Sequence, residues 1–495
     1  MDLSPLQNIL RKYIKGLALS SSILCLSPLG AAQAETLWDA VESSLANHPR
    51  YEIALLQIDA AEQKRIEERS AFFPTIKGGV TGGRVYGDNS TSRGLSVTRD
   101  SGYSWLWEGN VALTQTLFDG MGTANRSDAA QARLNAANYS KDDVEELLTL
   151  ETALAYLDVL RTQEALSILD KQQAALAKYR PQFKILVDQG AVDRTDQNQA
   201  EDMISALDGT KLEYISQLES AKARYNMMTG HDPDGDLAYV PATLDIPDDL
   251  DLALGWALEN HPQIRAAKGE SNAAWHDAEA EKSLFFPKID SELSYMKEDQ
   301  DDAIGGEAVD ARAVVKMNWA FSTGGAELSK FKRGRKLYQE SLAQRRNLEN
   351  TLTHAIKDSW ITRDKLNAQS GVSKRRQKLS QALLSTRREQ FEGGKISLFE
   401  LMQAHNQYYN LKIEKIMLRY AAYNSEFLLL GSMGALHSRL MPKVEMVSAV
   451  KDEEAIEDYC DHQRANQKDQ GIAGKGASGK AASLSELCPS SGDEL

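Results

Sequence analysis

Two histidines, His48 and His261, each stand between an asparagine and a proline, and imidazole is a common metal ligand and general acid or base. A metal site would need further histidine or cysteine ligands at coordinating spacing, and neither histidine has one. Each asparagine is expected to end a short helix, and each proline is expected to begin the next one. A structural role at a helix junction is therefore favoured over metal binding for both histidines.

A second apparent motif lies near the C-terminus, where Gly474, Gly479 and Lys480 have the spacing of a phosphate-binding loop. Ala481 stands where that loop needs a metal-binding hydroxyl, and no strand is expected before it, so the match is discarded. The sequence also has no HExxH, no GxSxG and no Cys/His cluster. It therefore predicts that the protein is not an enzyme, with no catalytic residue, no metal ligand and no cofactor.

The elements that position the two histidines occur twice in the chain. Residues 37–76 and 250–289 align without a gap at an offset of 213 residues and are identical at 15 of 40 positions. A self-match this long indicates duplication of a large unit rather than a short solenoid repeat. We therefore predict five parts: a signal peptide (1–34), a first repeat (35–230), a connector (231–248), a second repeat (249–434) and a partly disordered C-terminal tail (435–495).

Composition restricts the class of protein and its partners. The 495 residues carry a formal net charge of -14 at pH 7, which disfavours nucleic acid as a partner. The mean hydropathy is -0.44, and no apolar run after the N-terminal segment approaches the roughly 20 residues of a spanning helix. A bundle of membrane-spanning helices is therefore excluded.

The N-terminus has the pattern of a secretory signal, because basic residues precede an apolar run that ends in Ala-x-Ala. Cleavage is expected between Ala34 and Glu35. Cys25 raises the alternative of a lipoprotein anchor, but the residue before it is too bulky for such a signal. In an oxidising compartment Cys460 and Cys488 of the tail can form a disulfide, and two unpaired thiols are the alternative.

Each repeat changes from helical to alternating periodicity after a Phe-Phe-Pro sequence, which predicts a β-hairpin. In the second hairpin, apolar residues at odd positions from Val309 to Trp319 alternate with polar residues such as Arg312 and Lys316. The first hairpin alternates in the same way from Trp105 onward. Strands that are apolar outside and polar inside, with aromatic ends, are typical of a membrane β-barrel, although a soluble sandwich gives the same alternation.

Very long helices follow each hairpin. Helix formers dominate residues 122–189 and 325–392, which span on the order of 100 Å each if continuous. Pro181 is expected to kink the first of these helices, and the second contains no proline. Glycine turns at Gly190 and Gly394 then lead into return helices of about 35–40 residues. The last return helix has an unbroken 3-4 spacing that predicts a coiled-coil seam, formed by Phe399, Met402, Asn406, Tyr409, Ile413, Ile416, Tyr420, Tyr423, Phe427 and Leu430.

Two membrane-type strands in each repeat give four strands per chain, which is too few to close a barrel, because single-chain barrels begin at about 8. An open edge in lipid leaves unpaired backbone groups, at a cost of several kcal/mol each. If these strands span a membrane, the chain must therefore oligomerise, and a trimer supplies 12 strands.

The doubled Asn-His-Pro and Phe-Phe-Pro signatures, the strand hairpins, the long helices and the glycine turns resemble the TolC-like outer-membrane factors over residues 35–434. The resemblance implies a mixed α and β fold built from a duplicated unit. It implies a homotrimer whose 12-stranded membrane β-barrel is continuous with a long periplasmic α-helical barrel. The expected location is the outer membrane of a Gram-negative bacterium, in contact with outer-membrane lipid and extending into the periplasm.

The same resemblance implies a function as the exit channel of a tripartite export system, with a periplasmic adaptor protein and an inner-membrane ABC transporter. The overall arrangement and the long tail favour type I secretion of adhesin-like proteins. The first alternative is the outer-membrane channel of a drug-efflux pump that works with another efflux transporter. An alternative of a different class is a secreted coiled-coil structural or adhesive protein.

The resemblance also assigns roles to the helical tips, where the family has a glycine, a small hydroxyl residue and an acid on the first turn of the return helix. In the second repeat this pattern matches Gly394, Ser397 and Glu400, and in the first it matches Gly190 and Asp196, with Thr195 beside the acid. The resemblance assigns a periplasmic constriction to Glu400, Gln403, Asp196 and Gln199. It assigns contact with the adaptor to Gly190, Thr195, Phe391, Gly393, Gly394, Lys395 and Ser397.

Two departures from the family pattern modify these expectations. Gln199 and Gln403 stand where well-known members have a second acid, so the constriction is expected to carry less charge. Ile396 stands where an arginine holds the closed tip in the family, which leaves Lys395 or Arg194 for that role.

Overall fold

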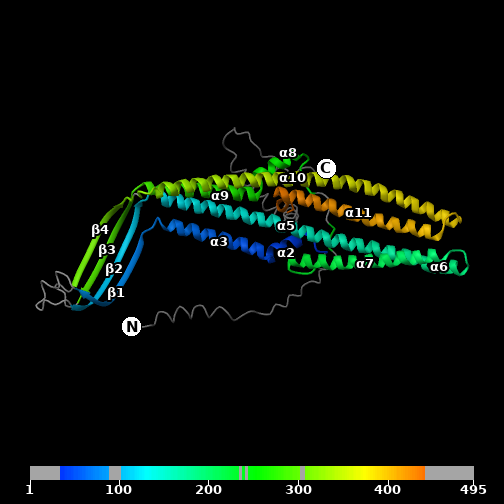
Figure 1. Ribbon diagram of the computed structural model, residues 1–495, viewed down its shortest axis with the longest axis horizontal. Helices are drawn as coiled ribbons and strands as arrows, with labels where there is room; N and C mark the ends of the chain where they lie inside the picture. The colour runs from blue at the N-terminus through cyan, green and yellow to red at the C-terminus, as the bar shows by residue number, and fades with distance from the viewer. Residues whose placement is uncertain are drawn as a thin grey trace, which may run out of the picture.

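The structure, a computed structural model, describes residues 34–87, 102–233, 237–239, 244–300, 307–320 and 322–440. Cys25 and most of the expected signal peptide lie outside the described residues, as do Cys460 and Cys488. The described chain is elongated (Figure 1). A four-stranded sheet forms one end, and long helices run from it to two hairpin turns at the other end.

The order of elements repeats along the chain. The first half contains α2 (Leu37–Asn47), α3 (Pro49–Ser70), β1 (Thr75–Gly87), β2 (Gly102–Phe118), α5 (Gly122–Ala177), α6 (Tyr179–Asp188) and α7 (Arg194–Thr229). The second half contains α8 (Leu250–Asn260), α9 (Pro262–Ala280), the 3-10 turn η1 (Glu281–Phe285), β3 (Lys288–Gln300), β4 (Glu307–Asn318), α10 (Ala326–Glu392), α11 (Leu398–Met433) and the short α12 (Leu436–Leu440). Each half therefore has two shorter helices, a hairpin, a long helix and a return helix.

The four strands form one antiparallel sheet in the order β1-β2-β3-β4, and its two faces differ as the alternation predicts. On the polar face, the Thr116 hydroxyl donates to Asp290 Oδ1 at 2.8 Å, and Lys316 lies 2.5 Å from Glu292 in an ion pair. The opposite face exposes apolar side chains: Ile76, Val80, Trp105, Trp107, Val111, Leu293, Tyr295, Val309, Val315 and Met317. Strands β1 and β4 are the edges of this sheet.

The two long helices differ as the sequence predicts. Helix α10 runs for 67 residues without interruption, whereas α5 ends at Ala177 and α6 begins at Tyr179. Pro181 has no N–H to donate to the carbonyl oxygen of Ala177, four residues earlier, and the helix breaks at Lys178 between them. This interruption lies three residues before the proline, and Lys178 itself keeps helical angles of φ -65° and ψ -21°, so the kink stays a prediction.

Helices α5 and α10 run most of the length of the helical part, and half-length helices lie end to end beside them (Figure 1). Near the sheet, α9 packs on both α5 and α10, and α3 packs on α5. Near the tips, α11 and α7 take the corresponding places. The end of α7 meets the end of α2, where Asn47 Nδ2 donates to the carbonyl oxygen of Thr229 at 3.1 Å. The end of α11 meets the start of α9, where a Cβ added to Gly434 would lie 2.7 Å from Pro262 Cδ.

The two histidines cap the helices that begin at these junctions. His48 Nδ1 accepts a hydrogen bond from the backbone N–H of Arg50 at 3.2 Å, and His261 Nδ1 accepts one from Gln263 at 3.2 Å. Burial lowers the pKa of His261 to about 4, so its ring stays neutral and keeps an acceptor nitrogen at neutral pH. The structural role predicted for both histidines is confirmed.

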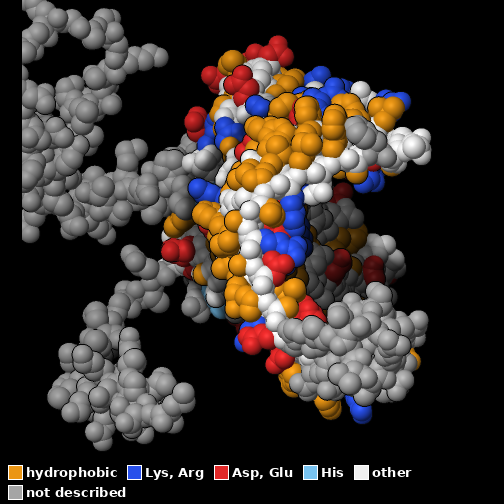
Figure 2. All heavy atoms as spheres, turned by 90° about the vertical axis from the view of Figure 1, so that its left-hand side faces the viewer, with side chains coloured by type: hydrophobic (Ala, Val, Ile, Leu, Met, Phe, Trp, Pro, Cys, Tyr) orange, Lys and Arg blue, Asp and Glu red, His pale blue; other side chains and the backbone are white. Residues whose placement is uncertain are grey.

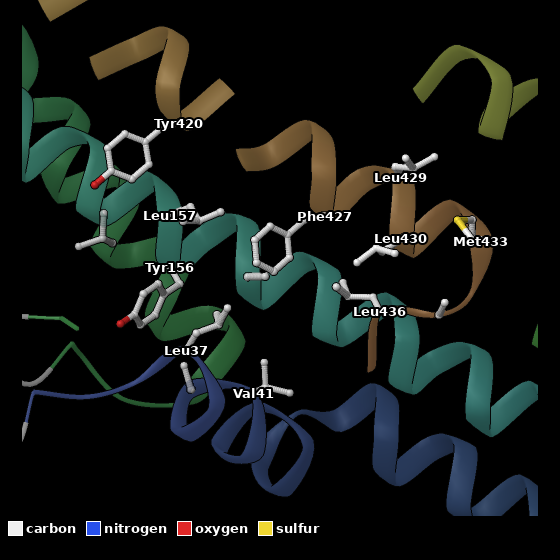
Figure 3. Close-up of a cluster of buried hydrophobic side chains, with 14 of the residues drawn as sticks. Leu37, Val41, Tyr156, Leu157, Tyr420, Phe427, Leu429, Leu430, Met433 and Leu436 are labelled. Atoms are coloured by element: carbon white, nitrogen blue, oxygen red, sulfur yellow. The ribbon is translucent and has the colours of Figure 1, made fainter. Parts of the chain in front are cut away.

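The largest buried cluster lies at mid-length and joins helices from both halves (Figure 3). It includes Leu37 and Val41 of α2, Tyr156 of α5, and Phe427 and Leu430 of α11. Because the cluster draws on both halves, neither half can bury its apolar side chains alone.

Helix α11 buries a wider surface than its predicted seam. Five seam positions are buried, namely Met402, Ile416, Tyr420, Phe427 and Leu430. Residues outside the seam are buried as well, namely Leu398, Leu401, Leu411, Ala422 and Leu429. Because α11 packs against both α5 and α10, it needs two buried faces. The prediction of a single two-helix seam was therefore too narrow.

Candidate functional site

The two hairpin turns at the far end of the helices have the same backbone conformation. Gly190 and Gly394 both have φ +69°, in the left-handed region that glycine adopts without a Cβ penalty. After each helix a six-residue hydrogen bond closes the turn, from the Ala191 N–H to the Leu186 carbonyl at 2.9 Å and from the Lys395 N–H to the Gln390 carbonyl at 2.8 Å. The predicted glycine turns are confirmed as two matching helix ends.

In the second tip, Ser397 and Glu400 form a reciprocal cap at the start of α11. The Glu400 N–H donates to the Ser397 hydroxyl oxygen at 3.1 Å, and Glu400 Oε2 accepts from the Ser397 N–H at 2.9 Å. This capping box satisfies two backbone donors that the helix start would otherwise leave open. The Glu400 side chain remains exposed to solvent although one oxygen is engaged.

In the first tip, the cap of α7 is Asp193. Asp193 Oδ1 accepts from the Thr195 N–H at 3.1 Å, so Thr195 is the second residue of α7 and Asp196 is the third. Sequence reasoning missed Asp193, although its signal was present. Asp193 follows Gly190 by three residues, and Ser397 follows Gly394 by three.

Apolar contacts hold the two tips together. One buried cluster takes Phe183 from α6, Leu384 from α10 and Leu398 from α11, and the half-buried Phe391 and Ile396 pack against it. Phe391 thus contributes to the core of the tip. Ile396, which replaces the arginine of the family pattern, adds apolar contact in place of a charge.

Two of the predicted constriction residues, Gln199 and Gln403, line different spaces of the chain. Gln199 and Thr195 line an open cavity of about 580 Å³ together with Phe399. Gln403 lines a separate groove of about 300 Å³ that also contains Asn406. Met203 borders both spaces.

Polar pairs cross between the helices just above the tips. Arg180 of α6 lies 2.7 Å from Glu201 of α7, and this pairing lowers the pKa of the Glu201 carboxyl. The Tyr179 hydroxyl lies 2.9 Å from His405 Nδ1, which links α6 to α11. Burial, together with the nearby positive charge of Arg388, lowers the pKa of His405. The Arg180–Glu201 pair joins the two arms of the first hairpin, and the Tyr179–His405 pair joins the first hairpin to the second.

The surface leaves much apolar area uncovered. Figure 2, which views the molecule from the sheet end, shows a broad area of hydrophobic side chains interrupted by basic and acidic ones. Exposed apolar residues also follow the outer helices, namely Leu212 and Met227 on α7 and Leu337, Ile361 and Leu379 on α10. The hydrophobic side chains gathered at the sheet end are typical of a surface that contacts protein or lipid.

Within the residues that the structure describes, no helix combines the length and apolarity needed to cross a membrane. Over the same residues, no three His, Cys, Asp or Glu side chains lie together in a way that would hold a metal ion.

A sequence model of the outer membrane efflux protein family matches residues 40–231 and 253–435, one stretch in each half. The chain belongs to this family, whose members are TolC-like outer-membrane channels with a transport function and no enzymatic activity.

Individual relatives agree with the family match. The chain is 23% identical over 413 residues to the outer membrane efflux protein BepC of Brucella suis, which covers 82% of this chain and 87% of that protein. It is 22% identical over 264 residues to the alkaline protease secretion protein AprF of Pseudomonas aeruginosa, which covers 51% of this chain and 53% of that protein. The crystal structure of the CmeC outer membrane channel of Campylobacter jejuni has the same fold, with a TM-score of 0.70 at 14% identity over 81% of this chain and 86% of that chain.

Proposed function

We propose that three copies of this chain form an outer-membrane exit channel, with a shared 12-stranded barrel in the membrane and a helical barrel in the periplasm. The observation that carries the proposal is the sheet. Its four strands have an apolar outer face and two free edges, β1 and β4, which only further strands can complete in lipid. Edge pairing between β4 of one copy and β1 of the next closes the barrel after three copies.

Helices α7 and α10 support the same arrangement, because both expose apolar side chains and because the two helices differ in net charge. Helix α10 carries 16 Lys or Arg against 7 Asp or Glu, whereas α7 carries 4 against 6. In a ring of copies, α10 of one chain would face α3 and α7 of its neighbour. Burial of Leu379 and Leu212 would drive such contact, and the charge difference would favour this pairing over contact between like edges.

Mass measurement of the purified protein in detergent tests the trimer. The proposal predicts a particle of three chains with intact β-sheet content. A stable monomer with the same β-sheet content would contradict it, and so would extraction from cells without detergent.

For the cargo, we propose type I secretion of an adhesin-like protein, together with a periplasmic adaptor and an inner-membrane ABC transporter. The name of AprF, an alkaline protease secretion protein, supports protein export. The name of BepC supports the efflux alternative with another transporter. Deletion of the gene separates these functions: loss of a large protein from the culture medium supports secretion, and drug sensitivity with an unchanged set of secreted proteins supports efflux.

We further propose that the tips dock the adaptor. They lie at the end of the molecule farthest from the sheet, and a Cβ added to Gly190 or Gly394 would meet nothing within 4 Å. Gly394→Trp is therefore expected to block export without an internal clash. Gly394→Ala is the matched control, because it has the same backbone strain without the bulk. Normal export by the tryptophan variant would contradict docking at this tip.

A further inference from the structure

Glu35, the residue before α2, is held in place through its backbone. Its carbonyl oxygen accepts two hydrogen bonds, from the Tyr156 hydroxyl of α5 at 2.8 Å and from the Ala238 N–H of the connector at 2.9 Å. Tyr156 belongs to the mid-length buried cluster (Figure 3). The position of Glu35 is therefore tied to the core that joins the two halves.

The Glu35 side chain is held as well. Its Oε1 accepts a hydrogen bond from the Tyr225 hydroxyl of α7, and His231 Nε2 lies 3.6 Å from the same oxygen. The side chain is only 10% exposed. Its second oxygen, Oε2, is buried and has no hydrogen-bond partner among the described residues. A buried carboxylate oxygen without a donor is costly, so this site calls for a positive group.

Ala34, immediately before, is exposed. The expected cleavage site therefore lies between an exposed residue, Ala34, and a residue held by the fold, Glu35. Hydrolysis there breaks the peptide bond between Ala34 and Glu35, adds hydroxyl to the Ala34 carbonyl carbon and leaves hydrogen on the Glu35 nitrogen. The new α-amino group takes up a proton and is positively charged at neutral pH.

We infer that the groups around Glu35 form a binding site for the processed N-terminus, in which the α-ammonium created by cleavage neutralises the buried carboxylate of the same residue. Four bonds separate the α-nitrogen from the carboxyl carbon, so the two cannot lie more than about 5 Å apart. At that distance and in a partly buried site, the attraction between opposite charges is much stronger than in water.

Removal of the signal would thus stabilise the fold as well as release the chain. The uncleaved chain has a neutral amide at this position, so the carboxylate would lack the positive group that the α-ammonium supplies. The inference rests on secretion and cleavage, and its readout is stability, so it can fail while the export function stands.

A double-mutant cycle on the full secreted protein tests the inference. One alanine is inserted between Ala34 and Glu35, so that cleavage leaves a one-residue extension, and intact mass confirms each N-terminus. The extension is expected to lower the Tm by on the order of 2–4 °C, because it moves the α-ammonium away. In the Glu35→Gln background the extension is expected to have little effect, because no carboxylate remains to be neutralised. Glu42→Gln removes an exposed carboxylate from nearby α2 and is the matched control, in which the extension should act as in the wild type.

An equal fall in Tm on extension of both the wild type and the Glu35→Gln variant would overturn the inference, and so would no fall in either. If the Glu35→Gln variant does not assemble, the Tyr225→Phe variant is measured instead. It removes one hydrogen-bond donor but keeps the Glu35 carboxylate, so the extension must still lower the Tm. A mature chain that begins anywhere other than Glu35 would also overturn the inference.

Discussion

In the second repeat, α10 reaches its tip as one uninterrupted helix, and Ser397 and Glu400 cap the return helix reciprocally. In the first repeat, the helix is interrupted at Lys178, and Asp193 caps the return helix by accepting from the Thr195 N–H. Both tips keep the left-handed glycine and a cap three residues later. Duplication has thus preserved the residues that set backbone direction, while the residues between them have diverged. We expect the second hairpin to be the stiffer of the two.

The two repeats also differ at the junctions between half-length helices, and substitutions there are expected to have the largest effect on the free energy of unfolding. Gly434 has φ +68°, and an added Cβ would lie 2.7 Å from Pro262 Cδ, whereas at Gly230 the nearest atom, in Asn47, would lie 3.4 Å away. Gly434→Ala combines backbone strain with overpacking and is expected to cost about 2–5 kcal/mol. Gly230→Ala has mainly the strain, about 1–2 kcal/mol. Denaturant unfolding measures both variants, and equal costs would contradict the asymmetry between the junctions.

An exchange of residues between the long helices tests whether the proline alone makes them different. Ser385 of α10 precedes Gly394 by nine residues, as Pro181 precedes Gly190. Ser385→Pro is expected to break α10 and cost about 3 kcal/mol. Pro181→Ser should restore the missing N–H donor and join α5 to α6. Helical content and Tm report both changes, and a Ser385→Pro variant as stable as the wild type would show that α10 does not depend on continuity.

The capping histidines should respond differently to acid. His261 is neutral in the fold, with its pKa lowered to about 4 by burial, and titrates near 6.5 when unfolded. The unfolded chain therefore binds the extra proton between these values, so stability falls as the pH drops through this window, by up to about 1.4 kcal/mol per pH unit. His261→Asn keeps a capping side chain and should remove this loss. His48→Asn, at a more exposed site, should change the pH profile less, and identical profiles for the two variants would contradict the account.

The caps at the two tips give the smallest expected effect. Asp193→Ala should cost about 1 kcal/mol, whereas Thr195→Ala should cost less than about 0.5 kcal/mol, because Thr195 follows the cap. Ser397→Ala should resemble Asp193→Ala with a further small loss from its capping-box partner. Tm measurements rank the three variants, and a larger loss at Thr195 than at Asp193 would contradict Asp193 as the cap of α7.

Much of the fold follows from local patterns in the sequence. Strand alternation and the glycine turns depend on backbone geometry within a few residues, and both are confirmed. The contacts between helix ends were not foreseen, because they join residues far apart in the chain, such as Asn47 and Thr229. The second buried face of α11 was missed for the same reason.

The candidate site was predictable only in part. The positions of Gly190 and Gly394 were correct, and Asp196 lies on the first turn of α7 as expected, but Asp193, the residue that caps α7, was not identified. Local spacing from the glycine would have identified Asp193. The packing of Phe391 in the apolar cluster could not be predicted from its own segment, because the cluster includes residues of the other hairpin. In a channel built from several copies, the side chains that face the pore are set by contacts between copies. Those contacts cannot be predicted from local patterns in one sequence.

We propose that the assembled channel conducts ions and is narrowest at the tips. Recording of the purified protein in planar lipid bilayers tests this proposal most directly. The account predicts discrete conductance steps that favour cations, because Asp196 and Glu400 from three copies would gather at the mouth. Glu400→Gln should reduce this selectivity, and multivalent cations should block only modestly because Gln199 and Gln403 are neutral. Bilayers that show no steps would contradict the account, and so would steps whose cation selectivity is unchanged in both Glu400→Gln and Asp196→Asn.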